Sequence, residues 1–351
     1  MDTMTSLLLT GVGAPGTEGT LYAIRKEIPK NLVVVGTDMK KQCAGSYLVD
    51  DFFSVPTPED PSYVSTINQI VKKCNITAIV PQTTREAIAF AANRHRFTVP
   101  IMVSQGTALR RAVDKWTLIL AVRPYVRVPH SYIFFDKESF LVGFNNLKSS
   151  RVIVKPRCSS GSRGVRIIST ETEDLNTILQ SKGSIPTIHV SHFLSILKKL
   201  PEPLKDGMIV QEYLPGDEYS VDVYCDRNNG VAAVPRLREK IINGISFETL
   251  VDMRKDLVII TRTICESLLL RYAIGLQFKL DERGDPALLE CNPRIQGTMV
   301  AGVFTGCNII GHAVADLLGR KSRSSKKPRK VSDVRYYRYW SGIGVVHGDP
   351  V

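Results

Sequence analysis

The chain of 351 residues has no apolar run long enough to cross a lipid bilayer, so we expect no membrane-spanning segment. Its start, Met1–Met4, lacks the basic segment of a secretory signal peptide, and the apolar stretch Leu7–Leu9 is too short for one. Its seven cysteines are odd in number and include no Cys-x-x-Cys pair, which argues against a disulfide framework and for reduced thiols. We therefore expect a cytoplasmic protein without a membrane partner.

Several catalytic signatures are also missing. No Gly-Lys-Ser/Thr sequence opens a helix, so there is no Walker A loop. His189 and His192 are three residues apart, but no acidic residue or cysteine stands at ligand spacing, which favours surface histidines over a zinc site. No local pattern indicates a Ser-His-Asp or Cys-His nucleophile.

The charge is unbalanced toward the basic side. Lys and Arg number 46 against 34 Asp and Glu, giving a formal charge of +12, which favours polyanionic partners such as nucleotides. Part of the excess lies in Arg320–Lys330, where no aromatic residue interleaves the basic ones. This pattern favours a solvated, partly mobile loop, so a nucleic-acid partner is not expected. If one existed, its binding would depend steeply on salt.

Length and pattern predict two or three domains. Residues 6–111 alternate between strands and helices, which indicates a parallel sheet flanked by helices. The expected strands are Leu7–Thr10, Leu32–Asp38, Ala78–Pro81 and Val99–Val103, with a helix through Leu21–Arg25.

The pattern changes after Val113. The expected elements are strands at Ser131–Phe135, Val152–Lys155, Gly164–Ile168, Met208–Tyr213 and Glu218–Tyr224, helices at His192–Leu200 and Asp256–Leu270, and closing strands at Tyr336–Trp340 and Val345–Val346. We therefore divide the chain into residues 1–112, 113–206 and 207–351, the last containing the basic loop and the closing strands.

A glycine loop, Gly11–Gly16, follows the first strand and fits G-x-G-x-x-G, while Asp38 ends the next strand. This is the dinucleotide fingerprint in outline. Because the rest of the chain offers no evident hydride-transfer site, a structural turn or a contact with a small substrate is favoured over nicotinamide or flavin binding.

The most informative stretch is a predicted hairpin of Gly275–Asp281 and Ala287–Asn292. Strand alternation puts Glu290 and Asn292 on one face, with Leu289 and Cys291 on the other, so that Cys291 is expected in the core. Gln277 on the partner strand can join Glu290 and Asn292. One carboxylate and two amide oxygens suit Mg²⁺ that phosphates also hold, and Arg294 beyond the strand suits a phosphoryl group.

Two further segments suit a nucleotide. Lys155 ends a strand and opens a loop of glycine and serine through Val165, whose N–H and hydroxyl groups can fold over phosphates. The bend between Gln211 and Asp222 exposes backbone groups near Glu212 and Leu214 that can bind an adenine edge. A hairpin loop and a solvated acidic turn are the plainer interpretations of these two segments.

Together, Lys115, the Lys155 loop, the acidic bend and the hairpin resemble the ATP-grasp superfamily. The similarity is to carbamoyl-phosphate-synthase large-subunit-like carboxylate–amine ligases, including the pyrrolysine-biosynthesis ligase, and it covers essentially the whole chain. It implies an α/β and α+β fold: a Rossmann-like preceding domain, a small lid subdomain and a C-terminal ATP-grasp domain. With one ATP-grasp unit, carbamoyl-phosphate synthesis itself is not expected.

The resemblance also implies roles for particular residues. Lys115 and Lys155 match phosphate-binding lysines, Glu218 the ribose acceptor, and Arg236 and Arg238 a substrate-facing pair. Glutamine at 277, where relatives often have an acid, supports the carbamoyl-phosphate-synthase branch. The implied catalytic residues are Arg294, Lys155 and Arg238, and the metal ligands are Gln277, Glu290 and Asn292. The implied ATP-binding residues are Lys115, Lys155, Ser160, Gly161, Arg163, Gly164, Gln211, Glu212, Tyr213, Leu214, Glu218 and Gln277.

The implied activity uses ATP and two Mg²⁺ ions, for which Mn²⁺ can substitute. A small carboxylate becomes an acylphosphate, and an amine, or in some relatives a thiol, then displaces phosphate. The alternatives are an ATP-binding regulator without ligase turnover and an NAD-dependent oxidoreductase. A homodimer is expected by analogy.

Overall fold

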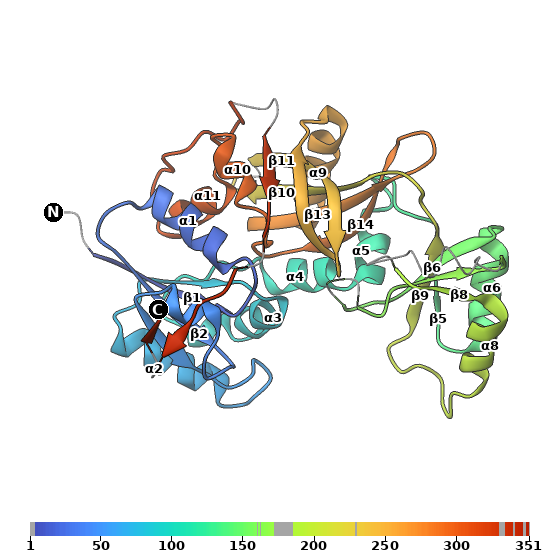
Figure 1. Ribbon diagram of the computed structural model, residues 1–351, viewed down its shortest axis with the longest axis horizontal. Coiled ribbons are helices and arrows are strands. Elements are labelled where there is room, and N and C mark those ends of the chain that lie inside the picture. Colours follow the sequence, from blue (N-terminus) through green and yellow to red (C-terminus); the bar gives the residue numbers. More distant parts are fainter. Residues whose placement is uncertain are drawn as a thin grey trace.

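The N-terminal region is a parallel sheet with helices on both faces, as its alternating pattern predicts. The computed structural model describes residues 4–159, 161, 163–171, 185–228, 230–329, 334–339, 341–346 and 349–350. The elements of this region are β1 (Thr5–Thr10), α1 (Thr17–Glu27), β2 (Leu32–Asp38), η1 (Ala44–Tyr47), β3 (Asp51–Ser54), α2 (Tyr63–Lys73), β4 (Ala78–Pro81), α3 (Thr84–Ala92) and η2 (Arg94–Arg96). The strand order is β3-β2-β1-β4, and all neighbours are parallel. Figure 1 shows α1 and α2 on opposite sides of β1 and β2.

Alternate residues of β1 pack against different helices on the two faces of the sheet. Leu7 and Leu9 are fully buried in a cluster with α1 and with α11 (Ile309–Leu317), whereas Leu8 packs with α2 on the other face. A strand buried on both faces reads as a continuous apolar run, which is why this one could be predicted.

The expected strand at Val99–Val103 is wrong in extent. Only Ile101 forms a parallel bridge, with Ile79 of β4. Pro100 has no N–H to donate to a ladder, and the Val103 N–H turns back to the carbonyl of Ile101 (2.9 Å). The segment therefore contributes a single bridge at the sheet edge.

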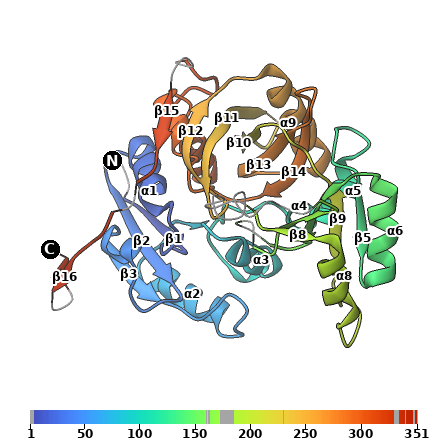
Figure 2. The ribbon, with the colours of Figure 1, turned by 45° about the vertical axis from the view of Figure 1, so that its right-hand side comes forward.

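The second region is a five-stranded sheet covered by helices on one face. It contains β5 (Ser131–Phe134), α6 (Lys137–Leu147), β6 (Arg151–Pro156), β7 (Arg166–Ser169), β8 (Thr187–His189), α8 (Val190–Lys198) and β9 (Met208–Glu212), with strand order β5-β9-β6-β7-β8. Figure 2 shows this region in green, with α6 beside β5. Val152 and Val154 pack with both helices. The intervening Ile153 and Lys155 therefore face the opposite side, toward the rest of the protein.

The third region is a six-stranded antiparallel sheet, of order β14-β13-β10-β11-β12-β15. Its strands are β10 (Glu218–Cys225), β11 (Val231–Ile242), β12 (Ile245–Val251), β13 (Tyr272–Leu280), β14 (Pro286–Asn292) and β15 (Arg335–Tyr337). One face packs against α4 (Gly106–Val113), α5 (Lys115–Val122) and α9 (Lys255–Leu268). The short α10 (Ala301–Phe304) precedes α11, and β16 (Val345–Val346) pairs with β17 (Asp349–Pro350) apart from this sheet.

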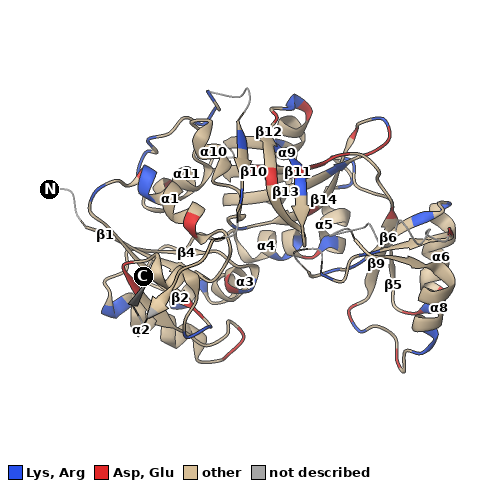
Figure 3. Cartoon of the chain, in the orientation of Figure 1, with Lys and Arg blue, Asp and Glu red and all other residues tan. Residues whose placement is uncertain are grey.

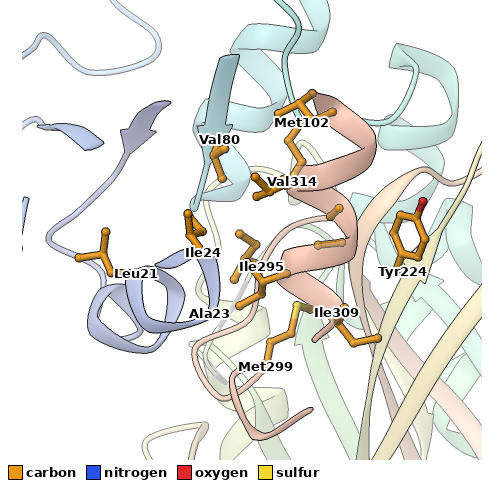
Figure 4. Packing of buried hydrophobic residues seen from close by; sticks show 14 of the residues in the cluster. Leu21, Ala23, Ile24, Val80, Met102, Tyr224, Ile295, Met299, Ile309 and Val314 are labelled. Carbon is orange, nitrogen blue, oxygen red and sulfur yellow. The ribbon is translucent and has the colours of Figure 1, made fainter. Parts of the chain in front are cut away.

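Helix α11 joins the third region to the first. One buried cluster holds Leu21 and Ile24 of α1 together with Ile309 and Val314 of α11 and Tyr224 of β10 (Figure 4). In the same interface, a Cβ on Gly16 would lie 2.5 Å from the Cα of Gly297, so these backbones touch directly. The two regions therefore form a close seam, beside which the site lies.

Two elements cross the expected limits of the lid. Strand β9 starts after residue 206 yet pairs with β5 and β6, and α5 starts after residue 113 yet packs on the third region. We propose that the lid begins at β5 and ends with β9, and that α4 and α5 belong with the antiparallel sheet.

The hairpin of β11 and β12 was not predicted, although its turn has a clear signal. Asn243 (φ 51°) and Gly244 (φ 74°) both adopt the left-handed conformation that a two-residue hairpin turn requires. An Asn-Gly pair between two β-branched, apolar stretches is the usual sign of such a turn.

The basic segment is anchored over the described residues 320–329. The Arg323 N–H and the Ser322 hydroxyl donate to the carboxylate of Glu27 (2.7 and 3.2 Å), and Lys326 pairs with Asp226 (2.6 Å). Basic and acidic residues are interspersed over all three regions (Figure 3). No helix in the described part of the chain is both long enough and apolar enough to span a bilayer.

Candidate active site

The β13–β14 hairpin carries the centre of the site. Gln277 lies opposite Glu290, but Phe278 lies opposite Leu288, so Leu289 is an extra residue in a bulge. Leu288 and Cys291 are buried in the core, as expected for Cys291. The prediction that Leu289 faces the core with Cys291 is wrong, because the bulge turns Leu289 and Glu290 toward the same cavity.

Glu290 is an ionised carboxylate held among hydrogen-bond donors and cations. The Asn292 amide donates to its Oε1 (2.9 Å), and Lys115 Nζ lies 3.4 Å from its Oε2. Burial by itself raises the pKa of Glu290, but Lys115, the Asn292 hydrogen bond and Lys155 outweigh it and leave the pKa below the ordinary value. The carboxylate is therefore charged and available as a ligand at neutral pH.

Lys115 is positioned by the start of α5. Asp114 caps this helix by accepting from the N–H groups of Trp116 and Thr117 (2.9 and 3.2 Å), and it also forms an ion pair with Arg157. Because Arg157 follows β6, this pair connects the helix to the lid. Lys115 is thereby aimed at Glu290 from the base of the lid.

Lys155 ends β6 on the cavity face of the lid. Its Nζ donates to the carbonyl of Leu289 (3.4 Å), and within the described residues it has no acidic side chain within ion-pair distance. Burial, together with Lys115, lowers the pKa of Lys155 to about 7. A buried amine without a counter-ion is a ready site for an anion.

A cavity of about 320 Å³, which we call the lid cavity, lies between β6, β9 and the hairpin. Its walls are apolar at Ile153, Ile167 and Leu289, while Lys115 and Lys155 line it together with Glu290. Gln211 also lines it, and its buried Oε1 has no hydrogen-bond partner among the described residues. The lining thus suits a ligand with a flat apolar part, a hydrogen-bond donor and a polyanionic tail.

Most of the expected ATP-binding residues meet at the lid cavity. Arg163 instead lines a neighbouring cavity, and Gly164 (φ 78°) lines neither cavity but packs on Pro156, where a Cβ would approach to 2.8 Å. Ser160 lies outside the described residues. Those brought together are Lys115, Lys155, Gly161, Gln211, Glu212, Tyr213, Leu214, Glu218 and Gln277.

The neighbouring cavity, of about 410 Å³, is lined by five arginines and a single acidic residue, Glu290. We call it the arginine cavity. It lies at the seam between the glycine loop and the antiparallel sheet, and it shares Gly161, Gly244, Gln277 and Glu290 with the lid cavity. Glu290 therefore lies where the two cavities meet.

Arg294 is held in the arginine cavity by the N-terminal region. Its Nε donates to the hydroxyl of Thr84 in α3 (3.2 Å), and its Nη1 donates to the carbonyl of Ile295 (2.8 Å). No carboxylate pairs with it among the described residues, and burial lowers the pKa of its guanidinium. It nevertheless stays charged at neutral pH.

Arg236 and Arg238 differ sharply although they are two residues apart on β11. Arg238 donates to Glu218, to Ser246 (2.7 Å), to the carbonyl of Gly244 (2.8 Å) and to Gln277 (3.4 Å), and it lines the arginine cavity. The β11–β12 turn that the sequence analysis missed therefore positions this side chain.

Arg236, in contrast, is fully buried and donates twice to Asp222 (2.6 and 2.8 Å) and once to Thr249 (3.3 Å). The expectation that it faces substrate is wrong, because its donors are directed to partners inside the sheet.

The metal ligands expected at Gln277, Glu290 and Asn292 lie together on the hairpin. They supply one carboxylate and two amides, and no cluster of three or more His, Cys, Asp and Glu side chains is found in the described part of the chain. Gln277 Oε1 accepts from Arg238, and the Asn292 amide donates to Glu290. Such a sparse set of oxygens fits Mg²⁺ that phosphate groups also hold, rather than a closed protein cage.

The groups of the glycine loop that would bind a dinucleotide are already bonded to each other. The Gly13 N–H donates to the carboxylate of Asp38 (2.8 Å), the group that would bind a ribose in a dinucleotide fold. The far end of the loop, Ala14–Gly16, lines the arginine cavity instead. This arrangement disfavours nicotinamide binding and leaves a structural turn or a contact with a small substrate.

Two family models match separate parts of the chain. Residues 205–339 match the family described as "ATP-grasp in the biosynthetic pathway with Ter operon", and residues 7–103 match "PylC-like, N-terminal domain". No curated protein matches the chain.

Solved structures match over nearly the whole chain. N5-carboxyaminoimidazole synthetase from Staphylococcus aureus has a TM-score of 0.69 at 14% identity, covering 93% of this chain and 80% of that one. A biotin carboxylase complex with β,γ-ATP from Campylobacter jejuni has a TM-score of 0.67 at 16% identity, covering 92% and 72%.

A biotin carboxylase domain from Hydrogenobacter thermophilus, with MgADP and bicarbonate, has a TM-score of 0.68 at 15% identity, covering 92% and 71%. These matches establish the fold and confirm the expected architecture of preceding domain, lid and antiparallel domain.

Proposed function

We propose that the chain is an ADP-forming carboxylate–amine ligase of the ATP-grasp superfamily, because residues 205–339 match an ATP-grasp family model and residues 7–103 a PylC-like N-terminal one. One observation carries the proposal: the ionised carboxylate of Glu290 lines both the lid cavity and the arginine cavity. A transferred phosphoryl group must pass from a nucleotide to an acid at one shared point, and Glu290 lies there.

We propose that the lid cavity binds ATP. The apolar side chains of Ile153, Ile167 and Leu289 suit the faces of adenine, and the unpaired Oε1 of Gln211 suits its amino group. Lys115 and Lys155 can then neutralise the phosphates. A triphosphate beside Lys155 would raise its pKa again, so that nucleotide binding and charging of the lysine are coupled.

Gln277, Glu290 and Asn292 would hold the Mg²⁺, with two ions expected. The metal supplies neutralisation of phosphate charge and alignment of the γ-phosphoryl group. Asn292 would act as a ligand after its side-chain amide rotates so that the oxygen faces the metal.

We propose that the arginine cavity holds the acid. Arg294 faces the transferring group, and Arg238 stabilises negative charge from the other side of Gln277. The acid oxygen attacks the γ-phosphorus and ADP leaves, which gives an acylphosphate; an amine then attacks the carbonyl carbon and releases phosphate. No protein nucleophile is needed, because the residues position the reactants and offset charge.

The regulator without turnover would use the same nucleotide contacts, so only turnover separates it from a ligase. A thiol could replace the amine without any change to the first step. The oxidoreductase is disfavoured by the Gly13–Asp38 contact. A homodimer, as in the biotin carboxylase domain matched above, is part of the proposal.

The proposal is tested by ADP release with Mg-ATP and a panel of small acids, using hydroxylamine as a general amine that traps acylphosphates as hydroxamates. We expect Glu290→Gln to lower ADP release by about a thousandfold. The variant should still fold, with a lower melting temperature, because Lys115 loses its carboxylate partner. Glu282→Gln, in the exposed turn of the same hairpin, is the matched control and should retain full activity. Wild-type turnover by the Glu290 variant would remove the ligase assignment, and ATP binding without any ADP release would favour the regulator.

A further inference from the structure

Arg338 is the second arginine in the arginine cavity without an acidic partner. It follows β15, and its backbone N–H donates to the carbonyl of Phe247 in β12 (2.7 Å), which fixes where the side chain starts. Its Nη2 donates to the carbonyl of Gly297 (2.6 Å). Among the described residues, no carboxylate lies within ion-pair distance of it.

The backbone is shaped to admit this guanidinium. A Cβ on Gly297 would lie 2.9 Å from Arg338 Nη2, so any side chain there would displace it. Gly297 in turn packs directly on Gly16 at the end of the glycine loop. Two glycines at a crossing of two chain segments thus leave room for one cation.

The surroundings of Arg338 are positive. Burial lowers the pKa of Arg338, and although Tyr336 opposes this shift, the charge of Arg236 adds to it. Gly16 is the N-cap of the eleven-residue helix α1 and provides no side-chain cap, so the positive end of this helix faces the same cavity. A cation in such a place is stabilised by an incoming oxyanion.

Arg294 and Arg338 are held by different parts of the chain. Arg294 is bonded to Thr84 in α3, whereas Arg338 is bonded to Gly297 over the start of α1. Arg85 and Arg238 line the same cavity but already have carboxylate partners, Glu59 and Glu218. Arg163, the fifth arginine of the cavity, lies on the loop between β6 and β7 and not at the seam. Of the other four, two guanidinium groups therefore remain for a ligand, at two separate anchor points.

We propose that the acid substrate carries a second oxyanion group, a carboxylate or a phosphate, and that Arg338 binds this group while Arg294 faces the carboxylate to be activated. The proposal rests on the ligase function above and specifies its substrate class. Arg338 then determines specificity and acts on substrate binding rather than on phosphoryl transfer. It also gives the glycine loop a role, since Gly16 shapes the pocket for the second group.

The test is calorimetric binding of acids to protein saturated with Mg²⁺ and a non-hydrolysable ATP analogue. The probes are succinate, with two carboxylates, and phosphoglycolate, with a carboxylate and a phosphate that is itself almost doubly ionised at neutral pH. We call both dianions because each carries two anionic groups, and butyrate, which carries one, is the monoanion. We expect at least one of the two dianions to bind at least about tenfold more tightly than butyrate. Tighter binding of succinate would identify the second group as a carboxylate, and tighter binding of phosphoglycolate would identify it as a phosphate.

Arg338→Met should lower affinity for the favoured dianion by about 10- to 100-fold and leave butyrate and nucleotide binding unchanged. Arg335→Met, on the exposed strand just before it, is the matched control and should bind the dianion like wild type. If Arg338→Met does not fold, Arg338→Lys can be used instead. It keeps the positive charge but loses the paired N–H donors of the guanidinium, and should lower affinity for the favoured dianion by about three- to tenfold.

Equal binding of succinate, phosphoglycolate and butyrate, or a dianion affinity that Arg338 variants leave unchanged, would overturn the inference. So would a failure of both dianions to bind. These results leave the ligase proposal intact as long as the nucleotide binds, whereas loss of nucleotide binding by wild-type protein would count against the ligase proposal itself.

Discussion

The lid cavity and the arginine cavity meet at Glu290 but use different cations. The lid cavity combines apolar walls with Lys115 and Lys155, whereas the arginine cavity is lined mainly by guanidinium, amide and hydroxyl groups. A lysine is a compact charge on a flexible stem that can follow a moving phosphate chain. An arginine is a rigid fork that matches a planar carboxylate. The difference separates a site for a nucleotide from a site for an acid.

If the arginines of the arginine cavity bind a ligand, they should differ from Arg236, whose partner lies inside the sheet. Arg236→Met should lower the free energy of unfolding by about 3–5 kcal/mol, because it leaves Asp222 buried and unpaired. Arg238→Met should cost less, about 1–2 kcal/mol, since its partner Glu218 is partly exposed and stays in contact with water, yet ADP release should fall by about a hundredfold. Urea unfolding and ADP release measure the two effects.

A double variant, Arg236→Met with Asp222→Leu, provides the control for Arg236 and should recover most of the lost stability. The distinction between the two arginines would fail if Arg236→Met unfolded at the wild-type urea concentration, or if Arg238→Met lost as much stability as Arg236→Met.

Protonation gives a second contrast between the cavities. Burial lowers the pKa of Lys155 to about 7, so its amine is mostly neutral at pH 8 in the free protein. Triphosphate raises this pKa, and ATP binding at pH 8 should therefore take up about one proton. Arginines stay charged, so acid binding in the arginine cavity should take up none. Calorimetry in buffers of different ionisation enthalpy measures both values.

Lys155→Met should abolish this proton uptake and weaken ATP binding by about 10- to 100-fold. The unfolded chain keeps the lysine protonated up to a pKa of 10.5, so burying it costs stability in full below pH 7, and the cost fades as pH rises toward 10.5. The ligand-free variant should therefore be more stable than wild type at pH 7 and equal to it near pH 10.5. A variant that is less stable at pH 7 would point to a structural role for Lys155.

The sequence predicts best what depends on neighbours along the chain. The strands Leu32–Asp38 and Ala78–Pro81 agree with the structure at both ends, because buried parallel strands are continuous apolar runs between turns. The grouping of Glu290 with Asn292 follows from strand alternation. The Asn243–Gly244 turn was equally readable and was missed.

What the sequence could not predict depends on distant pairing. The bulge at Leu289 is defined by the pairing with the partner strand, so the residues Ala287–Asn292 alone do not predict it. Arg294 bonds to Thr84, 210 residues away, and Arg338 to Gly297, 41 residues away. Similarly, Arg236 and Arg238 look alike in the sequence, and only the sheet shows which one has its partner inside the core.

The smallest expected effect concerns which base the lid cavity accepts. The Oε1 of Gln211 is buried and unpaired, so it can accept a hydrogen bond from the amino group of adenine but not from the oxo group of hypoxanthine. Wild-type protein should bind ATP about three- to tenfold more tightly than ITP, and Gln211→Leu should remove that preference. Because the variant also removes an unsatisfied buried acceptor, the ligand-free protein should be as stable as wild type or slightly more so. If ATP and ITP bind wild-type protein equally, Gln211 does not contact the base, and the lid cavity recognises its ligand through the apolar walls and lysines alone.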